Sequence, residues 1–129
     1  MRLSYVTFIA QDVDLMAEFY IAALGLDEVA ESRDHRYREV RGGGCMIGFA
    51  MAGVRAALNL PEAQPTGTRA LLTFQVDALA DLTEAVAKAC AAGAELVRGA
   101  ADTFFGQRQV VLRDPEGNVF RLSAALVPA

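Results

Sequence analysis

Few residues of this sequence have the chemistry of a metal ligand or a catalytic nucleophile. His35 is the one histidine among 129 residues, and it lies in the polar segment SRDHRYREV. A lone histidine in such a loop is more often an exposed side chain than a ligand. Cys45 and Cys90 form no CxxC pair and lie in apolar runs, so we expect two buried free thiols. Without a GxSxG motif, serine nucleophile chemistry has no support.

Two other segments have the composition of functional loops but the spacing of turns. Gly42-Gly43-Gly44 opens no helix and has no Walker lysine, so it predicts a hairpin turn and not a phosphate cradle. Asp114-Pro115-Glu116-Gly117 has proline in the second and glycine in the fourth position of a β-turn. Its two carboxylates are therefore expected to serve the turn.

The composition is that of one globular domain. Hydrophobic residues make up 53% and charged residues 22%, and the formal net charge is -4. A negative chain has no field that attracts nucleic acid or anionic lipid, so neither partner is expected. The N-terminal segment MRLSYVTFIAQD is interrupted by polar residues, and no apolar run approaches the roughly 20 residues of a membrane span. We therefore expect a cytoplasmic protein.

The hydrophobic pattern predicts one order of elements written twice. Alternating apolar residues indicate strands, and apolar residues at spacings of three and four indicate helices. Module one, residues 1–51, is expected to hold a strand, a helix and three strands at 5–10, 13–24, 26–31, 36–41 and 45–51. Module two, residues 69–129, is expected to repeat this order at 70–77, 79–89, 95–98, 107–113 and 118–124. Residues 52–68, with Pro61 and Pro65, are interpreted as a linker.

The two halves also agree in register. A shift of 66 residues lays Thr7-Phe8 on Thr73-Phe74, and a shift of 73 lays Gly44 on Gly117. Order and register together indicate an internal βαβββ repeat.

The segments that carry this repeat resemble a known family. YVTFIAQDVDLMAEFYIAALGL and FFGQRQVVLRDPEGNVFRLS are similar to the opening and closing signatures of the glyoxalase, bleomycin-resistance protein and extradiol dioxygenase superfamily. The resemblance implies an α+β fold in which two βαβββ modules form one glyoxalase-like domain over residues 1–129. It further implies a curved, mixed eight-stranded sheet around a cup, with helices on the outer face. A homodimer that completes the cup, and a small-molecule ligand inside it, are expected on the same ground.

Metal-dependent members of that family hold their metal with side chains of the first and last strands of each module. Carried over by register, these positions are Tyr5, Gly48, Leu71 and Arg121. Glycine and leucine have no donor, and a guanidinium repels a cation, so three of the four positions cannot chelate. We therefore expect no metal and no other cofactor.

Strand alternation separates the residues that face the helices from those that face the cup. The apolar set assigned to the helix side is Val6, Phe8, Cys45, Ile47, Phe49, Leu72, Phe74, Val76, Phe120 and Leu122. The opposite set combines apolar walls with hydrogen-bonding groups, as small-molecule pockets do. This candidate ligand-binding set is Tyr5, Thr7, Met46, Gly48, Leu71, Thr73, Gln75, Val119, Arg121 and Ser123.

Two functions from different classes follow from this set. In the first, a metal-free protein binds a small ligand in the cup without chemistry, and Arg121 pairs either with an anionic ligand or with a protein carboxylate such as Glu39. In the second, a glyoxalase-like lyase or a dioxygenase-like enzyme uses displaced or non-standard active-site residues, for example Arg121 or Tyr5. No catalytic residue is assigned, and the sequence favours the binding protein because donor chemistry is scarce.

Overall fold

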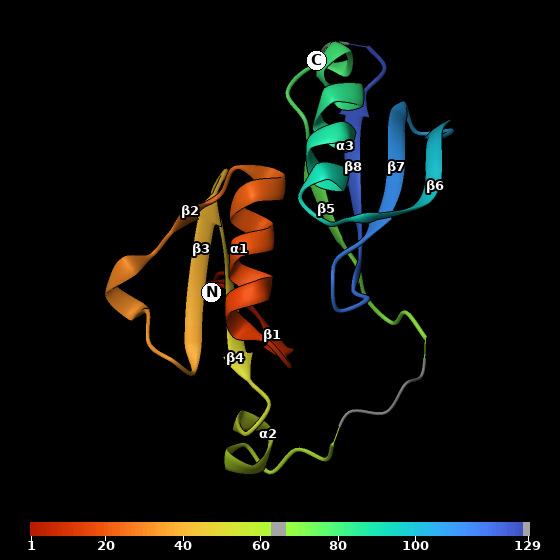
Figure 1. The fold of residues 1–129 in the computed structure, drawn as a ribbon. Coiled ribbons are helices and arrows are strands. Elements are labelled where there is room, and N and C mark those ends of the chain that lie inside the picture. The colour runs from red at the N-terminus through yellow and green to blue at the C-terminus, as the bar shows by residue number, and fades with distance from the viewer. Residues whose placement is uncertain (63–66, 128–129) are drawn as a thin grey trace. The chain divides into compact units, whose positions relative to one another are not determined.

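The computed structural model describes residues 1–62 and 67–127, and the chain forms two compact units, residues 1–65 and 66–129 (Figure 1). Each unit contains one of the predicted modules as a four-stranded mixed sheet with a helix on one face. The α+β class and the two βαβββ modules are thereby confirmed, with the eight strands divided between two sheets of four. In the described part of the chain, no helix has the length and apolar character needed to cross a membrane.

Module one follows the predicted order of elements. It consists of β1 (Val6–Ala10), α1 (Val13–Leu24), β2 (Asp27–Glu28), β3 (Tyr37–Gly42) and β4 (Cys45–Met51). The strand order is β1-β4-β3-β2, with β1 parallel to β4 and the other pairs antiparallel.

Helix α1 begins and ends where its capping residues predict. The Asp12 side chain accepts a hydrogen bond from the backbone N–H of Leu15 at 2.9 Å, and Gly25 ends the helix in the left-handed conformation with φ 66°. Tyr20 of α1 is fully buried, and its ring lies 5.4 Å from that of Phe49 and 6.3 Å from that of Phe8. Phe8 and Phe49 therefore face the helix, as strand alternation predicts.

Module two repeats the arrangement. It consists of β5 (Leu72–Gln75), α3 (Leu82–Ala91), β6 (Glu95–Asp102), β7 (Gln107–Arg113) and β8 (Val119–Ala125), in the strand order β5-β8-β7-β6. Thr7 pairs with Gly48 across β1 and β4, and Thr73 pairs with Arg121 across β5 and β8. The predicted register of the repeat is thereby confirmed, and Gly48 and Arg121 are equivalent positions of the two modules.

Three predicted strands differ from the structure by several residues, and one of them, expected at 70–77, is shortened to β5. The strand expected at 26–31 is reduced to β2 and is followed by the 3-10 helix η1 (Ala30–Ser32), where the Ser32 hydroxyl donates to the carbonyl of Val29 at 3.1 Å. The strand expected at 95–98 continues to Asp102. Register shifts between Leu96 and Arg98, and again between Arg98 and Ala101, interrupt its alternation, so no regular pattern marks its full length.

The segment interpreted as a linker is not wholly irregular. It contains the short helix α2 (Val54–Ala57), a run of residues that tolerate helical backbone. Pro65, one of the two prolines on which the linker interpretation rests, lies outside the described residues. A second 3-10 helix, η2 (Leu79–Asp81), leads into α3 and contains the first residue of the predicted helical stripe.

The prediction for the cysteines is wrong in one respect. Both are free thiols, but both are exposed. Cys45 is the first residue of β4, beside the turn, where its Sγ donates to the carbonyl of Gly42 at 3.0 Å. Cys90 follows the buried Ala89 on α3, and a step of one residue along a helix turns the side chain away from the packed face. An apolar run at the end of an element does not ensure burial.

Both predicted turns are present. Gly43 and Gly44 have φ angles of 56° and 83° between the paired residues Gly42 and Cys45, as a two-residue hairpin turn requires. The buried Asp114 accepts hydrogen bonds from the backbone N–H groups of Glu116 and Asn118 at 3.0 and 2.9 Å, so its carboxylate serves the turn.

Candidate functional site

A connected row of polar side chains crosses the middle of the module two sheet. Its members alternate along adjacent strands and lie on the face opposite the helix-side residues Phe74, Phe120 and Leu122. We call this set the polar row: Thr73 and Gln75 on β5, Arg121 and Ser123 on β8, and Gln107 and Gln109 on β7.

Arg121 is at one end of the polar row. Its Nε donates to the Thr73 hydroxyl oxygen at 3.0 Å, and its Nη1 donates to Gln109 Oε1 at 3.4 Å. The partners are thus neutral, and none of the carboxylates among residues 67–127 lies within ion-pair distance of this guanidinium. The arginine is half-buried, while Gln109 beneath it is buried.

The other end of the polar row consists of amides and a hydroxyl. Gln109 Nε2 donates to the Ser123 hydroxyl oxygen at 3.2 Å, and that hydroxyl donates to Gln107 Oε1 at 2.9 Å. Gln75 Nε2 donates to the same Gln107 oxygen at 3.0 Å. Ser123 is only 1% exposed, so this network fixes polar groups that would otherwise be buried without partners.

The equivalent face of module one has a different construction. Gly48 stands where module two has Arg121, and a Cβ built on Gly48 would overlap the ring of Tyr37, with the ring carbons Cε1 and Cζ both 2.8 Å away. The Tyr37 ring therefore occupies the space that a side chain at position 48 would need. Its hydroxyl donates to Glu39 Oε2 at 2.7 Å, and Glu39 is buried. Burial is the largest cause of the raised pKa of Tyr37, and this hydrogen bond is the second, so the phenol holds its proton more firmly than an exposed tyrosine does.

The ten residues of the candidate set are not all placed alike. Thr73, Gln75, Arg121 and Ser123 are joined in the polar row, whereas Thr7 lies beside Gly48 in the other module. Gly48 itself is buried beneath the Tyr37 ring, and the other four contribute apolar or aromatic surface. Tyr5 and Leu71 are exposed and each immediately precedes its strand, and Met46 and Val119 are half-buried within β4 and β8.

Sequence reasoning missed three residues of these faces: Tyr37, Gln107 and Gln109. A signal for the glutamines was present, because Gln107 and Gln109 alternate along their strand. They pair with Ala125 and Ser123 of β8, so strand pairing places them on the face of the polar row. No comparable signal marked Tyr37, whose place over Gly48 depends on the pairing of β3 with β4.

The residues present do not fit the metal that metal-dependent relatives would bind. Tyr37 fills the space above Gly48, Leu71 has no donor atom, and Arg121 places a permanent positive charge at the equivalent position of module two. Across residues 1–62 and 67–127, no three or more His, Cys, Asp and Glu side chains are grouped as they would need to be to hold a metal ion. His35 is exposed in the loop between η1 and β3, as expected.

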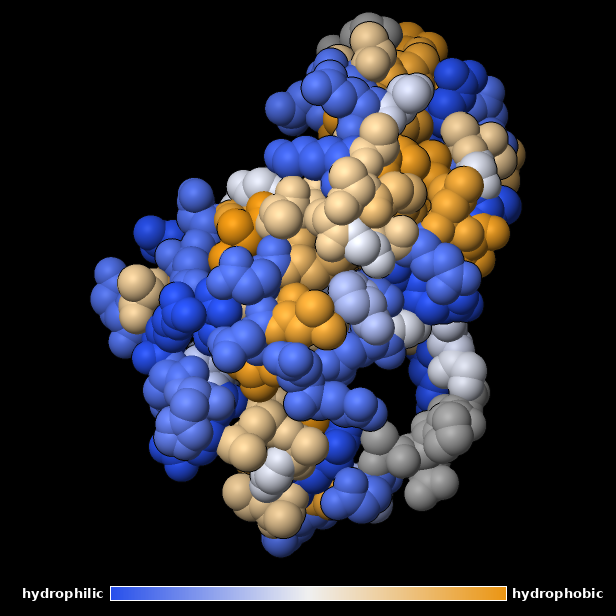
Figure 2. Space-filling model, viewed as in Figure 1, coloured by the Kyte–Doolittle hydropathy of each residue, from blue (hydrophilic) through white to orange (hydrophobic). Residues whose placement is uncertain are grey.

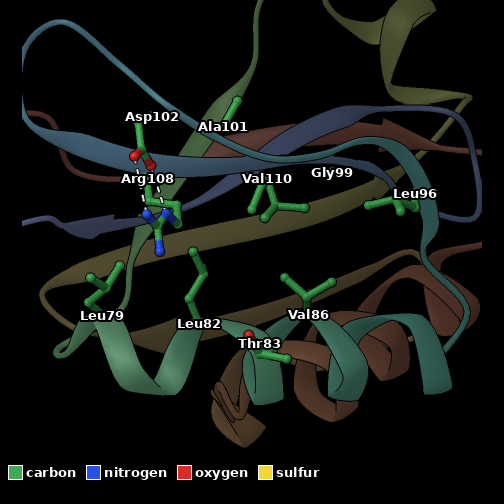
Figure 3. A pocket seen from close by; sticks show the side chains of 11 residues that line it. Leu79, Leu82, Thr83, Val86, Leu96, Gly99, Ala101, Asp102, Arg108 and Val110 are labelled. Carbon is green, nitrogen blue, oxygen red and sulfur yellow. Dashed lines mark hydrogen bonds and ion pairs between the residues drawn. The ribbon is translucent and has the colours of Figure 1, made fainter.

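A groove of about 590 Å³ lies on the helix side of module two, between α3 and β6 (Figure 3). Leu82 and Val86 of α3 point toward Val110 of β7 there, and the Arg108–Asp102 ion pair, with Nε to Oδ1 at 2.6 Å, lies at one end. Figure 2 shows hydrophobic surface on this side of the module. The groove is on the opposite face of the sheet from the polar row, so none of the ten predicted site residues lines it.

Comparisons with known proteins place this geometry in context. A model of the Glyoxalase/Bleomycin resistance protein/Dioxygenase superfamily matches residues 2–122. A glyoxalase/bleomycin resistance protein/dioxygenase family enzyme from Burkholderia phytofirmans PsJN is similar over 98% of this chain and 100% of its own, with 33% identity and a TM-score of 0.93. No curated protein gives a significant match.

Two further solved structures share the fold at lower identity. The fosfomycin resistance protein FosX from Mesorhizobium loti is 18% identical with a TM-score of 0.72, over 96% of this chain and 92% of its own. A lactoylglutathione lyase from Agrobacterium tumefaciens is 20% identical with a TM-score of 0.71, over 95% and 92% of the two chains.

Proposed function

Because the chain belongs to the glyoxalase/bleomycin resistance protein/dioxygenase superfamily, we propose that it binds a small molecule on the sheet faces that carry the ten candidate residues, without a bound metal. The single observation that supports this most is the exchange at position 121. Where the family resemblance places a metal ligand, this chain has an arginine hydrogen-bonded to Thr73 and Gln109. A fixed positive charge in that place excludes a cation and favours an anion.

The proposal includes a homodimer in the cytoplasm. Each sheet has two edge strands, β1 and β2 in module one and β5 and β6 in module two, whose backbone groups need a covering partner. A two-fold dimer is the commonest way to provide one. We expect sedimentation to give a dimer, and a monomer at concentrations on the order of tens of micromolar, with or without ligand, would contradict this part of the proposal.

An enzyme with displaced or non-standard residues is the second candidate. The observation that favours it is the Tyr37–Glu39 pair, a buried carboxylate that accepts a hydrogen bond from a phenol at 2.7 Å. Such a pair could hold a proton for acid-base chemistry. If this candidate is correct, a small-molecule substrate is consumed, and Glu39→Gln abolishes turnover while leaving the substrate bound.

A thermal-shift screen of small molecules tests the binding proposal. The purified protein is screened with a chelator, and in parallel with added zinc, nickel, iron or manganese. We expect ligands that raise the Tm equally under all conditions, because the binding groups belong to the protein. Stabilisation that appears only with a metal would contradict the proposal. Ligands that disappear during incubation would identify the enzyme instead.

A further inference from the structure

In the polar row, hydrogen bonds lead from Arg121 through Gln109 and Ser123 to Gln107, and they leave N–H donors free. The oxygens of Thr73, Gln109, Ser123 and Gln107 each accept a hydrogen bond from a neighbour in the row. Among the described residues of module two, Arg121 Nη2 and Gln107 Nε2 donate to no protein atom. An incoming ligand therefore meets N–H groups rather than acceptors at the Arg121 end.

Among residues 67–127, the positive charge of Arg121 has no carboxylate partner. Arg108 on the neighbouring strand is paired with Asp102 at 2.6 Å, and Arg113 is paired with Glu95 at 3.4 Å. Within the described part of module two, the partners of Arg121 are the neutral oxygens of Thr73 and Gln109. A half-buried guanidinium stays charged, so a bound anion would gain more here than at an arginine that already has a carboxylate.

The two hydrogen bonds fix the orientation of the guanidinium. With Nε held by Thr73 and one hydrogen of Nη1 held by Gln109, the plane of the group is set before a ligand arrives. Both hydrogens of Nη2 and the second hydrogen of Nη1 have no acceptor among residues 67–127. Two parallel N–H groups of this kind match the two oxygens of a carboxylate.

Apolar surface accompanies this fork. Val119 is half-buried two residues before Arg121, on the same face of β8, and Leu71 is 40% exposed immediately before β5. These side chains offer contact to a hydrocarbon body and no hydrogen bond. We infer that the ligand is a small carboxylic acid with an apolar body, whose carboxylate is held by the free edge of Arg121 and whose body lies against Val119 and Leu71. This inference rests on the proposed function.

Matched acid and amide probes test it. Calorimetric or NMR titrations compare benzoate with benzamide, and cyclohexanecarboxylate with its carboxamide, in the presence of a chelator. Each pair keeps its shape and differs in charge. For the wild-type protein we expect the acids to bind about tenfold or more tightly than the amides, as charge-assisted hydrogen bonds allow. Equal affinities within a pair, or no binding of any acid, would overturn the inference.

Substitutions test whether Arg121 causes the preference for acids over amides. Arg121→Gln is expected to bring the acid and amide affinities within about twofold of each other, and Arg121→Lys to retain part of the preference because it keeps the charge without the fork. Arg108→Gln is the control, since it removes a positive charge from the adjacent strand on the opposite face of the sheet. A preference that survives Arg121→Gln, or is lost in Arg108→Gln, would place the acid elsewhere and overturn the inference.

The outcome also separates this inference from the proposed function. If amides and acids bind equally well with a chelator present, metal-free binding is supported, but the inferred selectivity for acids is wrong. If no compound of the thermal-shift screen binds until a metal is added, the proposed function itself fails. Melting curves of both Arg121 variants establish that they are folded before they are titrated.

Discussion

Two arginines, one in each module, have different surroundings and therefore different roles. Arg38 on β3 is 1% exposed, with Nη1 3.1 Å from Asp14 and Nη2 2.7 Å from Glu18, and a further short contact joins it to Glu28. Arg121 on β8 is half-buried and has neutral partners only within the described part of its module. A buried charge surrounded by carboxylates holds the fold together, whereas a charge held by neutral groups remains available to a ligand.

The electrostatics of Arg38 agree with a structural role. Burial lowers the pKa of its guanidinium, but hydrogen bonds to Glu28, Glu18 and Asp14 outweigh burial and raise it. The hydrogen bond from Arg38 lowers the pKa of Glu28 in turn, against the effect of its own burial. Both groups are therefore charged in the folded protein at neutral pH, and removal of either leaves the other without its main partner.

The largest effect is expected for Arg38→Met. It removes the common partner of three carboxylates, and breaking a buried pair from one side costs about 3 kcal/mol, at the low end of its range here because Asp14 and Glu18 are exposed. Urea denaturation measures the change in the free energy of unfolding. A loss under about 1 kcal/mol would show that the cluster contributes little.

The next effect concerns the equivalent positions 48 and 121. Gly48→Ala places a Cβ against the Tyr37 ring and is expected to cost about 2 kcal/mol of unfolding free energy, because the ring must move. Combining it with Tyr37→Leu should recover part of that loss in a double-mutant cycle. Gly53→Ala is the matched control, since nothing lies within 4 Å of its Cβ and its φ of -60° suits alanine. Equal effects of the two glycine substitutions would contradict the close approach of Tyr37.

A smaller effect is expected from acid. The pKa of Glu28 is lowered from 4.5 in the folded protein, so its contribution to stability is complete above that value and is lost as the pH falls through the lower, folded pKa. Denaturation between about pH 3 and pH 6 should therefore show stability rising with pH more steeply in the wild type than in Glu28→Gln. Parallel curves for the two proteins would show that Glu28 has no linked proton.

The smallest change in stability is expected for Arg121→Gln. It loses hydrogen bonds to Thr73 and Gln109 but also removes a half-buried charge, so the free energy of unfolding should change by less than about 1 kcal/mol. Thermal and chemical denaturation check this. A loss as large as that of Arg38→Met would show that Arg121 is structural, as it would be if it were paired with a carboxylate such as Glu39.

Features of the fold that depend on residues close together in the sequence are predictable, whereas contacts between residues far apart along the chain are not. The bounds of helix α1, residues 13–24, are predictable because its apolar stripe and its flanking capping residues are local signals. Strand β6 was predicted too short, since its register shifts break the alternation that marks a strand. The burial of Arg38 left no sign in the segment 36–41, because its partners Asp14 and Glu18 are 24 and 20 residues away on α1.

The candidate site was predictable to the same degree. Alternation placed Thr73, Gln75, Arg121 and Ser123 on one face, which the structure joins in the polar row. Strand alternation did not give the direction of the hydrogen bonds between these side chains. Gln107 and Gln109 join the four residues only through the pairing of β7 with β8. That pairing determines which donors of Arg121 remain free.

Metal analysis combined with titration tests the central claim, binding without metal, most directly. The purified protein is analysed for zinc, nickel, iron and manganese and titrated with benzoate before and after treatment with a chelator. The account predicts less than about one tenth of an equivalent of any of these metals and the same benzoate affinity in both titrations. About one equivalent of a metal, whose removal abolishes binding, would contradict it.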